Sequence, residues 1–277
     1  MLIDYHIHNH FSSDSKQSTT DILKRAAELD LDEICITNHV ETFPPAGGEG
    51  TFDYQEAIDR FTKVKEDIDK TQKEHPNIKI KFGIELEYVE GWMPGIKKLV
   101  DKMGFDYMIG SIHEIDEYLV SSSQFCREFY EKYPEEHTYK RYFEAMYKLV
   151  GWGHFSAVGH FDICKKGGVE FYGPFKPKKY KDQIIPILKL MKEKGIGIEL
   201  NTSGLRYDCN EIFPHPDILK WCVEIGVEHY TIGSDGHRIE EVGKDLNKAL
   251  ALAKEIGIKT LSTYSKGKPT KFLISDS

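Results

Sequence analysis

The sequence has few cysteines, no long apolar run and no basic cluster, and each absence excludes a class of protein. Its five cysteines are scattered and form no CxxC pair, so we expect neither a disulfide framework nor a structural zinc knuckle. No apolar stretch approaches the roughly 20 residues that span a bilayer. The N-terminal segment MLIDYHIHNH lacks the basic and apolar regions of a signal peptide. We therefore expect a cytoplasmic protein that does not act at a membrane.

The charge of the chain is acidic, and its length suits one domain. The formal net charge is −8 without a long basic run, which disfavours binding to nucleic acid. A small anionic substrate is still compatible, because bound metal cations reverse the local field. Neither a repeat nor a convincing linker divides the 277 residues. We expect a single domain over residues 1–277, and nothing in the sequence indicates its oligomeric state.

Short β-rich runs alternate with longer amphipathic stretches along the chain. The longer stretches carry apolar residues at intervals of three and four, as at Ile22, Leu23 and Ala26, which predicts helices. Seven strand–helix alternations predict a parallel sheet, because each crossover helix returns the chain to the same end. A Pro/Gly-rich segment, 42–51, is expected to form a lid or pocket wall, and the tail after Lys259 a terminal strand or hairpin. The expected strands span 2–6, 33–37, 78–86, 105–109, 155–159, 197–200 and 228–232, and the expected helices 20–29, 54–74, 95–102, 136–150, 181–194, 216–225 and 240–256.

Potential metal ligands recur where the expected strands end. His6 and His8 are two residues apart, so both side chains leave the first strand on the same side and can reach one ion. One such strand is more often structural, but six strands ending in these residue types on one side of a parallel array indicate a shared site. Convergence on one point favours a closed barrel over an open doubly wound sheet. The later strand ends carry His39, Glu85, Glu87, His113, His160, Asp162, Glu199, Asn201, Asp235 and His237.

The expected ligand set is larger than one ion can use. A tetrahedral or five-coordinate ion takes four or five ligands, so two or three ions that share a bridging carboxylate fit better, with Glu85 as the bridge. Mixed imidazole and carboxylate ligands favour Zn, Mn or Fe(II) over Ca or Mg. The set comprises His6, His8, Asp14, His39, Glu85, His113, His160, Asp235 and His237.

Clustered divalent ions indicate phosphate ester chemistry, because they lower the pKa of a water and clamp phosphoryl oxygens during in-line attack. Arg206, in NTSGLR beyond the sixth strand, is best placed to grip the phosphate with two parallel hydrogen bonds. Arg238 is near the site but is the weaker candidate. Six histidines lack strand-end placement and are expected to be structural or at the surface: His10, His75, His137, His154, His215 and His229.

With these motifs in place, the chain resembles the PHP (polymerase and histidinol phosphatase) family over essentially its whole length, and most closely its monofunctional histidinol-phosphate phosphatases. The resemblance is carried by DYHIHNHFSSDS, ITNH, the strand-end Glu85, GSIHEI, GHFD, ELNTSGLR and GSDGH. It implies a distorted (β/α)7 TIM-like barrel with a trinuclear metal site. Asp14 departs from the pattern, since several members carry histidine there. By position, His6, His8, Glu85 and Asp235 would hold the first ion, Glu85, His113 and His160 the second, and His39, His237 and Asp14 the third.

The resemblance also implies hydrolysis of L-histidinol phosphate to L-histidinol and phosphate, a step of histidine biosynthesis. Arg206 would neutralise charge on the phosphoryl group, and a metal-bound water, Asp235 or His237 would protonate the leaving alkoxide. Glu41 and Glu114 are the expected partners of the substrate's imidazole and amine. The alternatives are another phosphatase or phosphoesterase of this family, acting on phosphotyrosine or a nucleotide, a metal-dependent amidohydrolase, and a non-enzymatic metal-binding module. The absence of a strand-end lysine weighs against the amidohydrolase.

Overall fold

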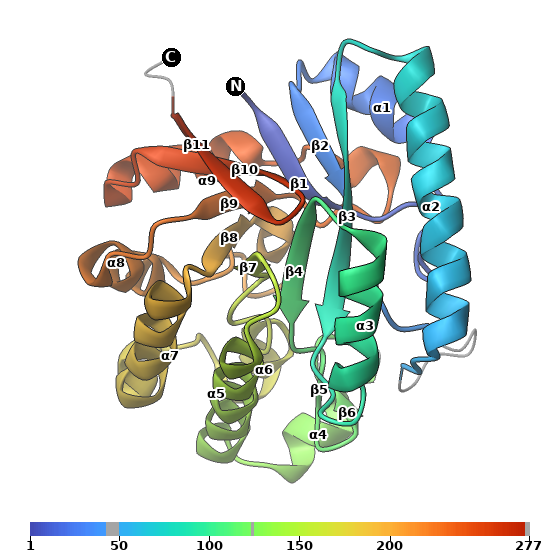
Figure 1. Cartoon of the computed structure of the whole chain (residues 1–277). Coiled ribbons are helices and arrows are strands. Elements are labelled where there is room, and N and C mark those ends of the chain that lie inside the picture. The colour runs from blue at the N-terminus through green and yellow to red at the C-terminus, as the bar shows by residue number, and fades with distance from the viewer. Residues whose placement is uncertain (43–49, 123–124, 275–277) are drawn as a thin grey trace.

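Seven parallel strands form the central sheet of the protein (Figure 1). The structure, a computed structural model, describes residues 1–42, 50–122 and 125–274. The strands lie side by side in the order β1-β2-β3-β4-β7-β8-β9, so that each crossover leads to the neighbouring strand. They are β1 (Ile3–Ile7), β2 (Glu33–Ile36), β3 (Lys79–Glu87), β4 (Tyr107–Ser111), β7 (Ala157–Val158), β8 (Gly197–Asn201) and β9 (Tyr230–Gly233).

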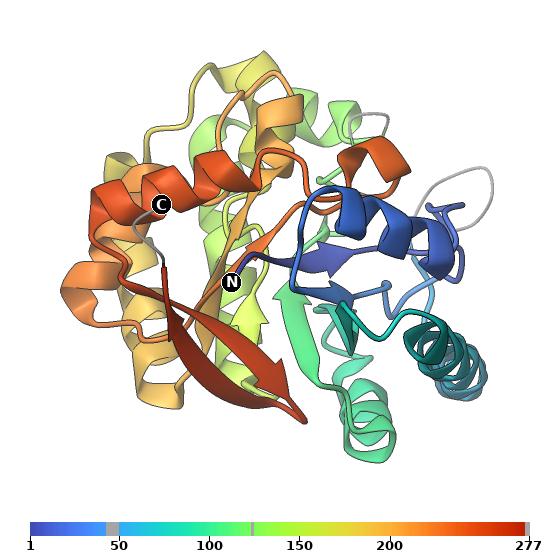
Figure 2. The same ribbon diagram turned by 90° about the horizontal axis from the view of Figure 1, so that it is seen from above.

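The sheet curves almost into a closed barrel, with the seam between β9 and β1. A single parallel bridge joins Ile7 to Gly236 across this seam. The amide of His8 donates to the Gly236 carbonyl (3.0 Å), and the Gly236 amide donates to the His6 carbonyl (3.3 Å). Seen from above, the helices lie outside the strands (Figure 2). The predicted distorted (β/α)7 barrel is therefore confirmed, and the weak seam and the two-residue β7 account for the distortion.

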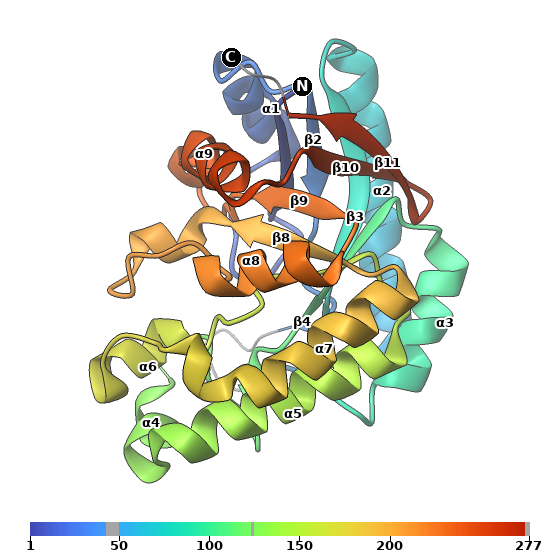
Figure 3. The same cartoon turned by 90° about the vertical axis from the view of Figure 1, so that its left-hand side faces the viewer.

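The helices cover the outer face of the barrel, and α5 and α7 pack against each other there (Figure 3). The last expected helix was placed too early: it begins at Leu246, because Gly243 (φ +70°) and Asp245 (φ +60°) interrupt the segment before it. Two short helices, α4 and α6, were not expected. The helices are α1 (Thr19–Glu28), α2 (Tyr54–Glu74), α3 (Met93–Met103), α4 (Arg127–Lys132), α5 (Glu135–Trp152), α6 (Lys165–Tyr172), α7 (Lys181–Lys194), α8 (Pro216–Ile225) and α9 (Leu246–Ile256).

Local sequence signals set the helix ends. The Asp53 carboxylate accepts a hydrogen bond from the Glu56 amide (2.8 Å) and caps the start of α2. Gly195 and Gly226 end α7 and α8 in the left-handed conformation, which glycine adopts at little cost. Among the described residues, no helix combines the length and the apolar character that crossing a bilayer requires.

A hairpin closes the amino-terminal end of the barrel, as expected for the tail after Lys259. It consists of β10 (Thr260–Ser265) and β11 (Lys268–Leu273). Tyr264 of this hairpin packs against Tyr107, with ring centroids 4.9 Å apart, and its amide donates to the Tyr5 hydroxyl. These buried aromatic rings fill the amino-terminal end of the barrel. The polar side chains of the expected site lie at the opposite, carboxyl end.

Two further segments lie at that carboxyl end. A short hairpin, β5 (Glu114–Ile115) with β6 (Tyr118–Leu119), follows β4 and was not expected. Residues 43–49 of the expected lid lie outside the described residues, and the flanking Thr42 and Thr51 form an antiparallel bridge. The β1–β2 pair shifts register between Asp4 and Ile7, next to His6, and such irregularities re-aim side chains at a barrel rim.

Candidate metal centre

The nine side chains of the expected ligand set meet at the carboxyl end of the barrel. They come from the ends of β1, β2, β3, β4, β7 and β9 and from the loop after β1. Together with Glu41, they form four overlapping groups, and within each group the ligand atoms lie within 4.8 Å of one another. The groups are His8, Asp14, His39 and His237; His6, His8 and Asp235; His6, Glu85 and His160; and His39, Glu41 and His113.

Glu85 lies at the centre of this cluster and is buried. Its Oε1 lies 2.8 Å from His160 Nε2 and 3.2 Å from His113 Nε2. Its Oε2 lies 3.1 Å from His39 Nδ1 and 3.2 Å from His6 Nε2. Burial alone would raise the pKa of Glu85, but His39, His6 and His113 outweigh burial and hold that pKa well below its ordinary value. The side chain is therefore an ionised carboxylate. Each of its two oxygens lies near a different pair of histidines, as a bridge between two ions requires.

His8 provides a test of whether the cluster suits metal ions. Both of its ring nitrogens are buried, and among the described residues neither has a hydrogen-bond partner, although the carboxylates of Asp235 and Glu85 lie 3.4 Å and 3.5 Å from Nε2. A buried polar group without a partner is costly, and a bound cation removes that cost. Burial lowers the pKa of His8 to about 3, with the neighbouring His237 and His39 adding to the shift, so the ring is neutral. A neutral imidazole is the form that ligates a metal, so His8 fits a divalent ion.

Asp235 follows the end of β9 and lies close to both His8 and His6. Its Oδ1 lies 3.4 Å from His8 Nε2 and 3.6 Å from His6 Nε2. The backbone of Asp235 has φ +54°, in the left-handed region that non-glycine residues seldom adopt. Such strain is retained where the surroundings hold it, often at functional sites.

Asp14, the position that departs from the family pattern, joins the cluster from the loop after β1. Its Oδ2 lies 2.9 Å from His237 Nε2 and 3.2 Å from His39 Nε2. The His237 ring also stacks on the His8 ring, with centroids 4.1 Å apart. The aspartate thus reaches the same two histidines that the third ion was expected to share.

Glu41 is a member of the cluster that the sequence reasoning placed elsewhere. It was expected to meet the imidazole or amine of a substrate, but it is buried, and its Oε1 lies 3.2 Å from His39 Nδ1 and 3.3 Å from His113 Nδ1. Its position two residues after His39 is the same spacing as His6 and His8, and that spacing was the available signal.

Two further carboxylates orient His6 and His113 by contacting the ring nitrogen that points away from Glu85. Glu199 Oε1 lies 2.8 Å from His6 Nδ1, and Glu87 Oε2 lies 2.8 Å from His113 Nδ1. In each histidine the other ring nitrogen faces Glu85. Carboxylates in this position fix the tautomer of a ligating histidine and raise its basicity. The sequence reasoning had noted both glutamates at strand ends without giving them a role.

Arg206 borders the cluster beside Asp235. Its guanidinium donates to the carbonyl of Ser234 (2.9 Å) and to the carbonyl of Asp235 (3.0 Å). Asn201 helps to place it, because the Asn201 side chain accepts from the Ser203 amide (2.9 Å) at the start of the 3-10 turn that carries Arg206. Arg238, the weaker candidate, is exposed.

The six histidines expected to be structural or at the surface belong to none of the four groups found among the described residues. His215 Nδ1 accepts from the Asp217 amide (3.0 Å) at the start of α8, and His229 Nδ1 lies 3.1 Å from Ser262 Oγ. The others pack on aromatic rings or end a helix: His10, His75, His137 and His154.

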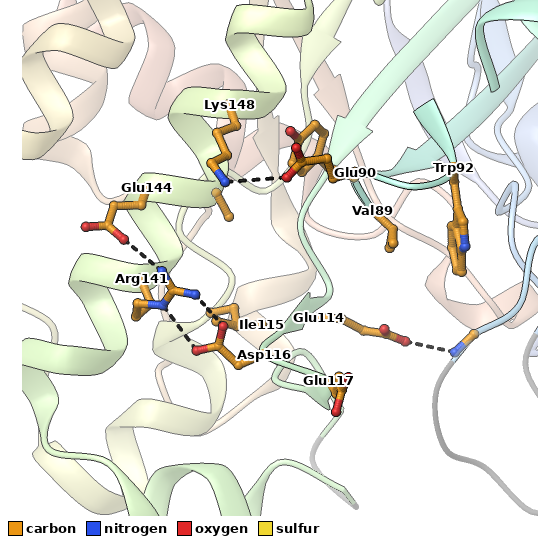
Figure 4. A pocket seen from close by; sticks show the side chains of 13 residues that line it. Val89, Glu90, Trp92, Glu114, Ile115, Asp116, Glu117, Arg141, Glu144 and Lys148 are labelled. Carbon is orange, nitrogen blue, oxygen red and sulfur yellow. Dashed lines mark hydrogen bonds and ion pairs between the residues drawn. The ribbon is translucent and has the colours of Figure 1, made fainter. Parts of the chain in front are cut away.

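A pocket of about 390 Å³ is lined in part by Glu114 (Figure 4). Glu114 follows His113 directly and accepts a hydrogen bond from the Gly50 amide (2.8 Å). An ion pair between Arg141 and Asp116 crosses one wall of the pocket. Acidic side chains outnumber basic ones in the lining, so its charge favours a cationic group. The acidic residues are Glu90, Glu114, Asp116, Glu117 and Glu144, and the basic ones are Arg141 and Lys148.

Comparisons with known proteins agree with this geometry. Residues 4–203 match the family described as PHP domain. A histidinol-phosphatase of Lactococcus lactis is 28% identical over 270 residues, which cover 95% of this chain and 94% of that protein. A probable histidinol-phosphatase of Clostridium acetobutylicum is 27% identical over 262 residues, which cover 94% and 95%.

Solved structures show the same fold. The histidinol phosphate phosphatase of Lactococcus lactis, complexed with zinc, L-histidinol and phosphate, has a TM-score of 0.84 at 27% identity and covers 97% of this chain and 98% of its own. A putative histidinol phosphatase of Listeria monocytogenes has a TM-score of 0.74 at 21% identity and covers 89% and 99%.

Proposed function

This chain belongs to the PHP domain family, and we propose that it is a metal-dependent phosphatase that hydrolyses L-histidinol phosphate to L-histidinol and phosphate. The observation that carries the proposal is the ionised Glu85 carboxylate, which lies within 3.2 Å of nitrogens of four histidines in a buried cluster. Curated relatives named as histidinol-phosphatases over nearly the whole chain support the substrate.

We propose that two or three Zn, Mn or Fe ions bind in this cluster. Zinc in the related Lactococcus lactis structure supports a divalent metal. When bound, such ions would lower the pKa of an attacking water and neutralise charge on the phosphoryl oxygens. The residues that would hold them are His6, His8, Glu85 and Asp235, then Glu85, His113 and His160, then His39, His237 and Asp14, with Glu41 available between the last two sets.

Arg206 would bind the phosphate. Two of its N–H groups are held by the carbonyls of Ser234 and Asp235, which fixes the plane of the guanidinium at the border of the cluster. The remaining N–H donors can form parallel hydrogen bonds to two phosphate oxygens. This arrangement stabilises the charge that the phosphoryl group carries during transfer.

The leaving alkoxide of L-histidinol needs one proton, and we propose that Asp235 or His237 takes it from the attacking water and delivers it to the alkoxide oxygen. These side chains keep 13% and 27% of their surface exposed, whereas those of His6 and His8 are fully buried. The acidic pocket at Glu114 would then accept the cationic end of the product. We therefore propose for Glu114 the role expected of it, and for Glu41 a place among the metal ligands, since it groups with His39 and His113.

A substrate panel tests the proposal. Purified protein loaded with Zn or Mn is assayed with L-histidinol phosphate, phosphotyrosine and a nucleoside monophosphate, and we expect the highest kcat/KM for L-histidinol phosphate. A higher value for phosphotyrosine or for the nucleotide would replace the substrate but keep the reaction. Hydrolysis of amides without hydrolysis of phosphate esters would overturn the proposal.

A further inference from the structure

Two of the four ligand groups take side chains from both sides of the barrel seam. His8 follows β1, whereas Asp235 and His237 follow β9. Within the described part of the chain, a single bridge, Ile7 to Gly236, pairs the two strand ends. Backbone pairing is therefore sparse at the place where the ligands of these groups must keep their distance. The other two groups take no residue from the end of β9 and do not cross the seam.

Gln17, in the loop between β1 and α1 (residues 8–18), joins the two strand ends through its side chain. Its Nε2 donates to the His8 carbonyl (2.5 Å) and to the Gly236 carbonyl (2.8 Å). Gln17 keeps only 7% of its surface exposed, and its Oε1 has no hydrogen-bond partner among the described residues. The two N–H donors of one side-chain amide thus hold one carbonyl on each side of the seam.

The same loop brings Asp14 to the seam, where its Oδ2 lies 2.9 Å from His237 Nε2. The hydroxyl oxygen of Ser15, the next residue, lies 3.0 Å from the carbonyl oxygens of both His8 and His237. A hydroxyl has one proton and donates to one of these carbonyls at a time, whereas the amide of Gln17 donates to two carbonyls at once. Gln17 is therefore the stronger of the two links across the seam.

We propose that Gln17 is a positioning residue for the ions held across the seam, because it fixes the backbone of His8 relative to the residues that follow β9. This inference rests on the metal site of the proposed function. Gln17 acts on the ligands through their backbone carbonyls and is not a ligand itself. A neutral amide suits the position, since a carboxylate would place an oxygen against two carbonyl oxygens.

Competition between the metal-loaded protein and a chelator of known affinity tests the inference, with the residual metal measured by elemental analysis. Gln17→Met keeps the size of the side chain and removes both donors. We expect the dissociation constants of the ions held across the seam to rise roughly tenfold, the lower end of the range for loss of an outer-shell partner. An ion held by Glu85, His113 and His160 keeps its affinity, because these ligands follow β3, β4 and β7.

Two further measurements separate positioning from general support of the fold. Activity of Gln17→Met should fall at limiting Zn or Mn and return close to that of the wild type at excess metal, because the ligands themselves are intact. Gln17→Glu should weaken metal binding more than Gln17→Met does, since the carboxylate repels the two carbonyl oxygens that the amide held.

Gln72→Met is the matched control. The Gln72 Nε2 also donates to two backbone carbonyls, those of His75 (3.0 Å) and Ile78 (2.9 Å), but it does so before the start of β3, at the amino-terminal end of the barrel. We expect this variant to lose stability in urea unfolding and to bind metal as the wild type does. Should Gln17→Met not fold, Ser15→Ala takes its place, with a smaller loss of affinity for the same ions.

Wild-type affinity for every ion in the folded seam variant would overturn the inference. An equal loss at all ions, or a loss of the same size in Gln72→Met, would also overturn it, because the effect would then come from destabilisation of the whole barrel. If the wild type prefers another phosphate ester and Gln17→Met still loses the seam ions selectively, the substrate proposal fails and the inference stands. A wild-type protein that binds no ion would overturn both.

Discussion

His6 and Glu199 form a buried pair, with Nδ1 of the histidine 2.8 Å from Oε1 of the glutamate. The pair joins β1 to β8, and the opposite nitrogen of the ring, Nε2, faces Glu85 at 3.2 Å. Glu199 also accepts from the His160 amide (2.9 Å) through its other oxygen. One carboxylate thus sets the positions of two expected ligands that come from different strands.

Glu199→Gln should therefore weaken metal binding without removing a ligand. We expect the dissociation constant for Zn or Mn to rise about 10- to 100-fold, the usual cost of losing an outer-shell partner of a ligating histidine. Competition with a chelator of known affinity measures the change. Glu33→Gln is the control, because Glu33 is also buried but accepts from the Tyr5 hydroxyl away from the cluster. Equal losses in both variants would show that the effect comes from general destabilisation.

Glu85→Gln should remove most of the activity, because an amide cannot bridge two cations as a carboxylate does. A loss of a few kcal/mol of transition-state stabilisation corresponds to about a thousandfold decrease in kcat/KM. Metal content by elemental analysis should fall in the same variant, while the far-ultraviolet circular dichroism stays unchanged. Full metal content with full activity would contradict the bridging role.

Arg206→Lys should not restore the function of Arg206→Ala, since a lysine cannot make the paired, planar contacts of a guanidinium. We expect both variants to lose about 100-fold or more in kcat/KM, as for the removal of one stabilising donor at a developing charge. Arg238→Gln provides the comparison, because Arg238 is exposed and should leave kinetics close to those of the wild type. An active Arg206→Lys variant would show that charge alone suffices.

Chelation should destabilise the fold as well as abolish activity, because the metal binds the folded cluster and not the unfolded chain. At a free metal concentration of 100 times the dissociation constant, the stabilisation is about 2.7 kcal/mol. For a chain of this size, this corresponds to a fall in Tm of roughly 5–10 °C on chelation. Thermal melts before chelation, after it and after metal is restored measure the effect. An unchanged Tm would indicate that the cluster binds no ion tightly.

Much of the barrel could be predicted because buried parallel strands and amphipathic helices leave strong local patterns. The ends of β1, β3 and β8 were predicted within one or two residues for this reason. The late start of α9 was missed, since the left-handed backbone at Gly243 and Asp245 follows from packing and not from periodicity. The single-domain assignment of residues 1–277 and the ligand roles themselves stay predictions.

The site was predictable where a ligand ends a strand and less so where it lies beyond one. His39 and Glu41 follow β2 in an irregular segment, where alternation gives no direction for a side chain. The approach of Glu41 to His113 joins residues far apart in sequence, which no local pattern records.

Gly233 should be essential to the His6–Glu199 pair, because a side chain there would occupy the same space. A Cβ built on Gly233 would lie 2.2 Å from Glu199 Oε1 and 2.4 Å from His6 Cβ, which are distances that require both residues to move. We expect Gly233→Ala to cost about 1–3 kcal/mol in the free energy of unfolding, as overpacking does, and to weaken metal binding.

Urea unfolding and chelator competition measure these two effects of Gly233→Ala. Gly91→Ala is the control, because a Cβ on Gly91 meets no heavy atom within 4 Å. The double variant Gly233→Ala, Glu199→Gln should lose less metal affinity than the two single losses combined, because both substitutions disturb the same contact. Fully additive losses would mean that Gly233 acts through a different part of the barrel, and the close approach of β9 to His6 would then not be what positions this ligand.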